Sequence, residues 1–283
     1  MSSMDAHTTK ILGSEVKYWI FNNDKPRTIV MVHGFRGTHR GLQDIVDALP
    51  DFRIVIPDLP GFGDSTPMTE QPHTMRGYAE CIRQLIHKLK LKQVIILGHS
   101  MGTMIGAELV ALEPRLVSRL VLVNPIAEHP LRGFGVIAMS PGVLYHWLGG
   151  KVLPEKIGHW LLSNKLLFLI GSATMTKTKD KQLRKKIHNN HITYMSKFHN
   201  RHTLLEAYYA SMNTTVTEQV AHIKVPTLLI AGKVDTIAPI AGQRKLANLL
   251  EHSQLIELDN VGHIIHYEKP REAAQAIRKF LAS

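Results

Sequence analysis

Residues 94–102 read VIILGHSMG, and this stretch decides the fold that we expect for the whole chain. Four residues that favour a buried β-strand run without a gap into a serine, Ser100, that has a glycine two positions before it and another two positions after it. A helical pattern then follows from Met101 to about Leu112. A strand that turns this sharply into a helix holds its serine in a strained backbone conformation, and glycines are required where side chains would collide. The stretch therefore predicts a serine nucleophile that faces the N-terminus of the following helix.

A nucleophilic serine needs a histidine as general base and an acid that orients the histidine, and in this kind of sheet the acid comes first along the chain. Residues 225–231 (VPTLLIA) form a predicted strand, and Asp235 follows its end. Residues 255–258 form another, and His263 lies on the loop after it. Taken singly, Asp235 also fits a helix N-cap and His263 a surface position. Together they follow the carboxyl ends of strands, where open α/β sheets gather catalytic groups, so we predict a triad of Ser100, Asp235 and His263.

The loop after the predicted strand at residues 28–32 reads HGFRG and supplies a candidate oxyanion hole. A tetrahedral oxyanion needs two backbone donors, one from the residue after the nucleophile and one from this loop. We assign the two donors to the N–H groups of Met101 and Phe35, with the adjacent glycine keeping the backbone close. The predicted substrate contacts are Gly34, Arg36, Ile126, Trp147 and Trp160.

These motifs together resemble the α/β-hydrolase superfamily, of the serine esterase and lipase type with a helical cap. The resemblance covers about residues 10–125 and 223–283 and is carried by HGFRG, DLPGFGDS, GHSMG, GKVD and VGHIIHYEKP. Haloalkane dehalogenases and epoxide hydrolases of this superfamily carry aspartate at the nucleophile position, so Ser100 argues against both chemistries. Thr103 stands where many relatives have glycine, which is a mild departure on the first turn of the helix.

Strand and helix patterns alternate up to Val123 and resume at Val225, which is typical of a doubly wound, mostly parallel sheet with helices on both faces. The residues between them lack strong strand signals and are predicted to form several helices. We therefore divide the chain into a first part of an α/β-hydrolase core at residues 1–124, a helical cap at 125–222 inserted after the sixth strand, and a second part of the core at 223–283. The first nine residues are predicted to be loose.

Composition fits a soluble globular protein with a sizeable core, since the chain has 283 residues, of which 44% are hydrophobic and 20% charged. The single cysteine, Cys81, excludes an internal disulfide and fits a reducing compartment. No signal-peptide pattern opens the chain, and its apolar runs are shorter than the roughly 18–20 residues of a membrane span. These features predict a cytoplasmic location.

The net charge of +11 is concentrated in the predicted cap. Residues 126–222 contain 12 Lys or Arg against 5 Asp or Glu, and the densest part lies at residues 177–186. A solvated helix face explains this pattern, and the functional alternatives are peripheral contact with an anionic membrane or steering of an anionic substrate. Nucleic acid is not expected as a partner, because no motif that reads nucleic acid accompanies the charge.

The predicted activity is hydrolysis of a small-molecule carboxylic ester through an acyl-enzyme, with an apolar or lipid-like acyl group indicated by the leucines and aromatic residues of the cap. This chemistry requires no metal and no organic cofactor. One alternative keeps the triad and hydrolyses a carbon–carbon bond of the meta-cleavage-product type, with Arg36 binding the carboxylate of the substrate. Another is a ligand receptor on the same scaffold. The natural substrate and the oligomeric state are not specified by the sequence.

Overall fold

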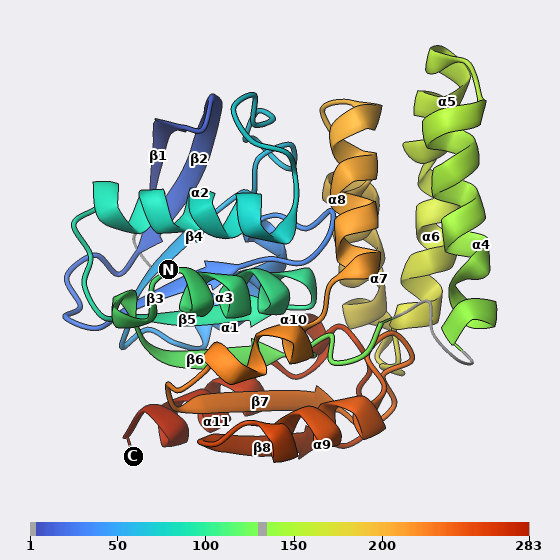
Figure 1. The fold of residues 1–283 in the computed structure, drawn as a ribbon. Coiled ribbons are helices and arrows are strands. Elements are labelled where there is room, and N and C mark those ends of the chain that lie inside the picture. The colour runs from blue at the N-terminus through green and yellow to red at the C-terminus, as the bar shows by residue number, and fades with distance from the viewer. Residues whose placement is uncertain (1–3, 130–134, 283) are drawn as a thin grey trace.

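The computed structural model describes residues 4–129 and 135–282, which are built around an eight-stranded sheet (Figure 1). The strand order is β1-β2-β4-β3-β5-β6-β7-β8, in which β1–β2 and β2–β4 are antiparallel and the remaining neighbours are parallel. This is the mostly parallel sheet that the sequence predicted. The strands are β1 (Met4–Ile11), β2 (Ser14–Phe21), β3 (Thr28–Val32), β4 (Arg53–Pro57), β5 (Val94–His99), β6 (Val117–Val123), β7 (Thr227–Gly232) and β8 (Ser253–Leu258).

Helices cover both faces of this sheet. Successive side chains of a strand point to opposite faces, and in the central strands the side chains on both faces are apolar and are buried by helices. In β5, Ile96 belongs to one buried cluster, while Ile95 and Leu97 belong to the other. The first cluster includes side chains of α2 (Met75–Lys88), α3 (Met101–Leu112) and α9 (Ile240–Leu249), and the second includes α1 (Gln43–Asp47), α10 (Ile265–Glu268) and α11 (Pro270–Ala282). Because both of its faces are covered, the strand is apolar along its length, and so it could be recognised in the sequence.

The chain start differs from the prediction that its first nine residues are loose. From Met4 onward the backbone forms β1, which pairs with β2 along its whole length. Leu12 and Gly13 both have positive φ (49° and 76°), as a tight two-residue hairpin turn requires. Most side chains of β1 are exposed, so the strand is defined by its backbone hydrogen bonds to β2. Backbone hydrogen bonds do not depend on a pattern of hydrophobic residues, and the sequence therefore did not predict this strand.

The insertion between β6 and β7 is helical, as predicted, and lies beside the end of the sheet to which the β7 arrow points (Figure 1). Residues 130–134, which fall inside the predicted cap, lie outside the described part. The cap consists of α4 (Gly135–Trp147), η3 (Leu148–Val152), α5 (Glu155–Leu162), α6 (Lys165–Met175), α7 (Lys181–Asn190), η4 (His191–Met195) and α8 (Arg201–Asn213). Three short 3₁₀ segments complete the elements: η1 (His39–Leu42), η2 (Pro114–Leu116) and η5 (Val216–His222). None of the helices described is long and apolar enough to cross a membrane.

Candidate active site

Ser100 stands at the junction of β5 and α3 in the strained conformation that the sequence predicted, with φ 52° and ψ −118°. A side chain at Gly98 would overlap the carbonyl oxygen of Gly102, and one at Gly102 would overlap that of Val32. Both glycines are therefore required for the turn to pass this close to β3. Ser100 remains partly exposed, so its hydroxyl is accessible to a substrate.

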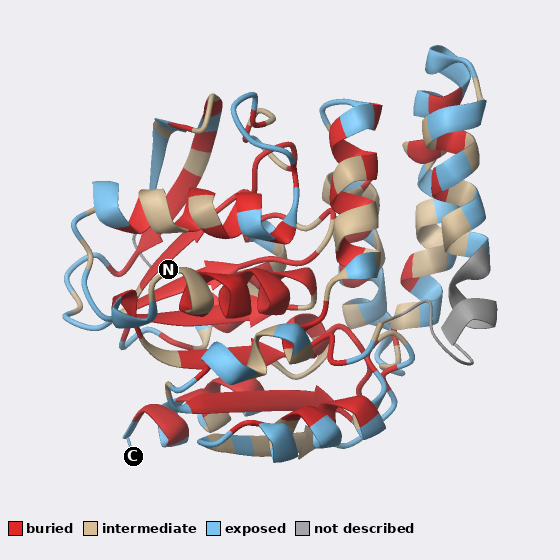
Figure 2. Ribbon diagram, viewed as in Figure 1, coloured by how far each residue is buried: buried red, intermediate tan, exposed pale blue. Residues whose placement is uncertain are grey.

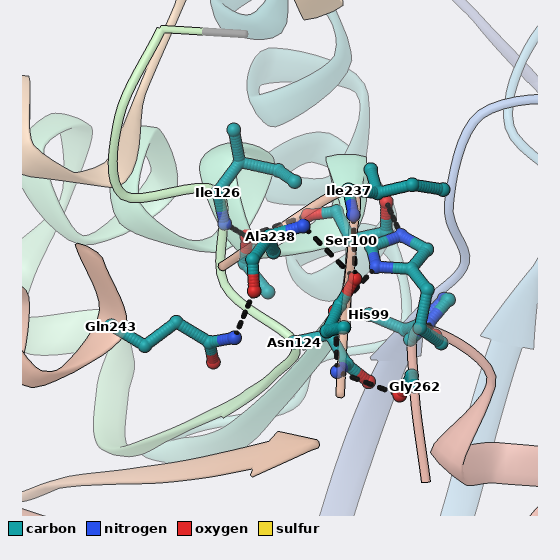
Figure 3. Close-up of polar contacts among 11 residues, drawn as sticks. His99, Ser100, Asn124, Ile126, Ile237, Ala238, Gln243 and Gly262 are labelled. Carbon is teal, nitrogen blue, oxygen red and sulfur yellow. Dashed lines mark hydrogen bonds and ion pairs between the residues drawn. The ribbon is translucent and has the colours of Figure 1, made fainter. Parts of the chain in front are cut away.

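The three residues predicted as a triad lie together in hydrogen-bond contact. Figure 3 shows Ser100, Asn124 and Gly262 in this site, with their polar contacts dashed. His263 Nε2 is 2.8 Å from Ser100 Oγ, and His263 Nδ1 is 2.8 Å from Asp235 Oδ2. Asp235 follows β7 and His263 follows β8, and both side chains are buried. An imidazole placed between a hydroxyl and a buried carboxylate can accept the hydroxyl proton and be stabilised as an imidazolium.

Asp235 is held as an ionised carboxylate by four hydrogen bonds. Its Oδ1 accepts from the N–H groups of Ile237 (2.8 Å) and Ala238 (3.0 Å), and its Oδ2 accepts from His263 and from Asn124 Nδ2 (2.8 Å). Burial raises the pKa of Asp235, but attraction to His263 and these hydrogen bonds outweigh burial, so the pKa lies below its ordinary value. Asp235 is not the N-cap of α9, whose N-cap is Pro239; its Oδ1 orders the loop between β7 and α9, while its Oδ2 contacts His263.

Asn124 is a residue of this site that sequence reasoning used only to mark the start of the cap. It follows β6 with φ 50°, and its Nδ2 also donates to the carbonyl oxygen of Gly262, next to His263, at 3.2 Å. Asn124 therefore fixes the side chain of Asp235 and the loop that carries His263 at the same time. An asparagine directly after a buried strand was the available signal, since asparagine tolerates positive φ better than most residues.

The two backbone N–H groups predicted to form the oxyanion hole are not used by other hydrogen bonds among the described residues. Within the part of the chain that the structure describes, the N–H groups of Phe35 and Met101 donate to no protein acceptor. Gly34 packs against Ser100, because a Cβ there would be 3.1 Å from Ser100 Cβ. The loop after β3 thus reaches Ser100, and the assignment of Phe35 and Met101 to an oxyanion hole stays a prediction consistent with this placement.

Of the other predicted substrate contacts, Ile126 lies near the nucleophile helix and the tryptophans do not lie in a buried pocket. Ile126 is buried, and its N–H lies 3.4 Å from Thr103 Oγ1 on the first turn of α3. Trp147 and Trp160 are 45% and 62% exposed on the cap, so much of each ring faces solvent. Aromatic composition alone could not separate the inner from the outer face of the cap, and the assignment of Trp147 and Trp160 as substrate contacts stays a prediction.

The guanidinium of Arg36, another predicted substrate contact, is buried and hydrogen-bonds to the cap. Its Nε donates to the carbonyl oxygen of Met195 and its Nη2 to that of Leu162, both at 2.9 Å. The guanidinium carbon lies 4.3 Å from the ring centre of Phe168. Leu162 ends α5 and Met195 ends η4, so a cation here compensates the partial negative charge of two helix ends. Arg36 therefore fastens the loop of Phe35 to the cap through Nε and Nη2. Its Nη1 is buried and has no hydrogen-bond partner among the described residues, and the contact of Arg36 with a substrate stays a prediction.

Replacing Arg36 with methionine is expected to destabilise the protein by about 2–4 kcal/mol, because the cap carbonyls lose a charged donor in a buried place. Urea unfolding measures this loss, and limited proteolysis shows whether the cap loosens first. Arg40 is exposed and stacks on Tyr194 at 5.2 Å, so Arg40→Met is the matched control and should cost less than about 1 kcal/mol. Equal losses in the two variants would contradict a fastening role for Arg36.

A group of buried histidines surrounds the site, and sequence reasoning did not single it out. His99 Nε2 donates to the carbonyl oxygen of His263 at 2.8 Å, and the His99 ring lies 4.1 Å from that of His266, centre to centre. Burial, reinforced by His263, lowers the pKa of His99 to about 3, and burial holds the pKa of His266 well below its ordinary value. These rings stay neutral, and His99 fixes the backbone that carries His263.

Three buried histidines, His99, His146 and His191, lead us to expect that the protein loses stability in mild acid. Burial lowers the pKa of His99 to about 3 and those of His146 and His191 to about 4, from an ordinary value of 6.5. At a pH between the lowered pKa of a buried histidine and about 6.5, that histidine is protonated in the unfolded chain and neutral in the folded one. The free energy of unfolding therefore falls as the pH drops below about 6.5, by about 1.4 kcal/mol per pH unit for each histidine. Urea unfolding at several pH values measures this slope. In His191→Gln the slope should be smaller by the contribution of one histidine. An unchanged slope would contradict the prediction, whereas a uniform offset would report only lost packing.

No group of three or more His, Cys, Asp or Glu side chains within residues 4–129 and 135–282 is placed to hold a metal ion. A surface hollow of about 610 Å³ lies between residues 67–73 and the start of α8, and its lining contains no triad residue. His73 in that hollow donates from Nδ1 to Glu206 (2.8 Å) and accepts the N–H of Met68 at Nε2 (3.0 Å), so both of its nitrogens have structural partners.

Comparison with known proteins places this fold and site in a family. The chain belongs to the alpha/beta hydrolase fold family, whose sequence model matches residues 27–270. It is 25% identical to the putative carbamate hydrolase RutD of Pseudomonas syringae over 260 residues, which cover 90% of this chain and 94% of the relative. It is 27% identical to human monoacylglycerol lipase ABHD6 over 272 residues, which cover 90% of this chain and 75% of the relative. The crystal structure of the enol-lactonase from Burkholderia xenovorans LB400 has a similar fold, with a TM-score of 0.77, 21% identity and coverage of 98% of this chain and 100% of that chain.

Proposed function

We propose that this protein is a serine hydrolase that cleaves carboxylic esters through an acyl-enzyme. The observation that carries the proposal is His263, whose two ring nitrogens lie 2.8 Å from Ser100 Oγ and 2.8 Å from Asp235 Oδ2. Asn124 hydrogen-bonds to Asp235, and His99 hydrogen-bonds to the carbonyl oxygen of His263. These contacts restrict the orientation of the His263 imidazole. A site preorganised in this way suits acyl transfer, in which the same imidazole first accepts a proton and then donates it.

The reaction then proceeds in two halves. His263 removes the proton of Ser100 as Oγ attacks the ester carbonyl, and Asp235 stabilises the imidazolium. The N–H groups of Phe35 and Met101 bind the oxyanion, and each such donor is worth about 2.7–4 kcal/mol where one has been removed from an enzyme. His263 protonates the leaving alcohol, and a water molecule activated by the same histidine releases the acid from Ser100.

An apolar or lipid-like acyl group is the substrate class that we favour. The loop after β3 lies between the nucleophile and the cap, and Phe35 packs there against Phe62, with ring centres 5.8 Å apart. The cap side of this loop is aromatic as well, since Phe35 also contacts Tyr208 at 5.7 Å. Among the relatives, the name monoacylglycerol lipase supports this class, whereas carbamate hydrolase and enol-lactonase indicate the breadth of acyl compounds that similar proteins cleave.

Carbon–carbon bond hydrolysis is disfavoured by the position of Arg36. That alternative needs a cation that the substrate can reach, and Arg36 is buried, with its Nε and Nη2 donating to carbonyl oxygens of the cap. A ligand receptor on the same scaffold differs from an enzyme in its turnover: it would hydrolyse model esters barely and would shift its melting temperature when a ligand binds.

The test is hydrolysis of p-nitrophenyl esters with acyl chains from acetyl to palmitoyl, measured for the wild type beside Ser100→Ala. We expect serine-dependent turnover that peaks at one chain length, which then reports the depth of the acyl pocket. Absence of serine-dependent turnover at every length, from folded protein, would overturn the proposal and favour a ligand receptor.

A further inference from the structure

Among the described residues, most of the large apolar side chains that are exposed lie on the cap. Of the twelve large apolar side chains that are exposed in the described part of the chain, eight lie between residues 144 and 170. We call these eight the apolar cap surface: Leu144, Trp147, Val152, Ile157, Trp160, Leu166, Leu167 and Ile170. An exposed apolar patch of this kind on a folded chain marks a surface that contacts something else.

The apolar cap surface follows helical spacing on three successive helices. Leu144 and Trp147 are three residues apart on α4, and Ile157 and Trp160 are three apart on α5. Leu166 and Ile170 are four apart on α6. Residues at these spacings share one face of a helix, so each helix presents an apolar stripe to solvent. In Figures 1 and 2, α4 and α5 form the edge of the cap farthest from the sheet, with exposed residues along them.

Cations are interspersed with these stripes. Between residues 144 and 170 the charged side chains are Lys151, Lys156 and Lys165, all exposed, and one acid, Glu155. Glu155 is paired with Arg201 at 3.4 Å, so its charge is partly compensated. The neighbouring helix α7 contacts α6 and adds further exposed basic side chains, namely Lys181, Arg184 and Lys185.

We propose that the apolar cap surface docks on an anionic lipid bilayer, with its aromatic and aliphatic side chains in the headgroup and upper acyl region and the lysines on the headgroups. Helices with an apolar stripe bordered by lysines lie in this interface, and exposed tryptophans are favoured there because their rings are amphipathic. Long lysine side chains can keep their charge at the headgroups while their stems cover apolar surface. A second copy of this chain fits less well, because a symmetric contact would bring lysines against lysines.

Binding is best measured with Ser100→Ala protein, so that the result does not depend on hydrolysis of the lipid. In co-sedimentation, we expect binding to phosphatidylcholine vesicles that contain phosphatidylglycerol, and weaker binding to phosphatidylcholine alone. Changing Ile157, Leu166 and Ile170 to glutamine together should weaken binding at least tenfold, since burying even one large apolar side chain is worth about tenfold in an equilibrium constant. Glutamine keeps the helix propensity.

The matched control is Leu249→Gln on α9, because Leu249 is 56% exposed and Ile157 is 52% exposed. This control should bind vesicles like the parent. Changing Lys156 and Lys165 to glutamine should lower affinity for the anionic vesicles by about fivefold per lysine and leave binding to phosphatidylcholine alone unchanged. Loss of binding in Leu249→Gln equal to that in the triple variant would overturn the assignment of the docking surface.

Tryptophan fluorescence gives an independent readout of depth. Trp147 and Trp160 are exposed and Trp19 is buried in the core, so brominated phosphatidylcholine should quench the two cap tryptophans and shift their emission to the blue. Absence of quenching at saturating vesicle concentrations would overturn insertion. A concentration-dependent dimer that the triple glutamine variant abolishes would overturn the lipid assignment in favour of a second copy. Turnover of a short soluble ester by protein with Ser100 intact tests the proposed function separately, and the triple variant should leave it unchanged.

Discussion

Replacing Ser100 with alanine is expected to lower kcat for p-nitrophenyl ester hydrolysis by about 10⁴–10⁶-fold while the protein stays folded. In the proposed reaction the hydroxyl oxygen of Ser100 attacks the ester, and alanine offers no such group to His263 Nε2, which lies 2.8 Å from that oxygen. Steady-state hydrolysis at the preferred chain length measures the loss. Ser163→Ala, a serine of the cap that hydrogen-bonds only to its own helix, is the control and should hydrolyse at the wild-type rate. A Ser100→Ala enzyme within tenfold of the wild type would exclude this serine as nucleophile.

The strained backbone at Ser100 adds a second readout to the same prediction. A glycine adopts φ 52° and ψ −118° without the cost that a side chain imposes, so Ser100→Gly should be as inactive as Ser100→Ala and more stable than the wild type by about 1 kcal/mol. Thermal unfolding of the three proteins measures this difference. Inactivity combined with a gain in stability is the signature of a residue held in strain for its chemistry, and a loss of stability in Ser100→Gly would contradict it.

Replacing Asp235 with asparagine is expected to lower kcat by about 10⁴-fold. The Asp235 carboxylate accepts on both oxygens, from Ile237 and Ala238 at Oδ1 and from His263 and Asn124 at Oδ2. An amide has one acceptor oxygen, so its NH2 group faces N–H donors on one side, and the histidine is left in the wrong tautomer or orientation. Attraction to His263 and the hydrogen bonds to the carboxylate hold Asp235 ionised in the wild type despite its burial, and this charge, which stabilises the imidazolium in the proposed reaction, is lost in the variant.

Asp259→Asn is the matched control for this second prediction. Asp259 lies on the loop after β8, and its exposed carboxylate pairs with Lys233 at 2.8 Å. Removing a surface ion pair costs little, so this variant should keep the wild-type kcat and nearly the wild-type stability. Similar losses of kcat in Asp235→Asn and Asp259→Asn would exclude a specific role for Asp235.

Local sequence patterns were sufficient to predict the parts of the molecule whose conformation depends on residues adjacent in the sequence. The strand, tight turn and helix around Ser100 are encoded within 94–112, because buried apolar runs and paired glycines restrict the backbone locally. The order of Ser100, Asp235 and His263, each after a strand, was enough to predict that they meet, since parallel strands bring their carboxyl ends to one edge of the sheet. The parallel sheet and the helical insertion followed from the same alternation of patterns.

Tertiary structure alone decided the contacts that join distant parts of the chain. Asn124 meets Asp235 across 111 positions, and Arg36 meets Met195 across 159, and no local pattern carries such pairings. Whether Trp160 faces a pocket or solvent depends on how the cap helices pack, which composition does not specify. Hydrogen bonds and burial of single side chains are set by the three-dimensional neighbours of a residue. The sequence by itself therefore determined the fold class and the candidate nucleophile, and only the folded chain decided which residues support that site.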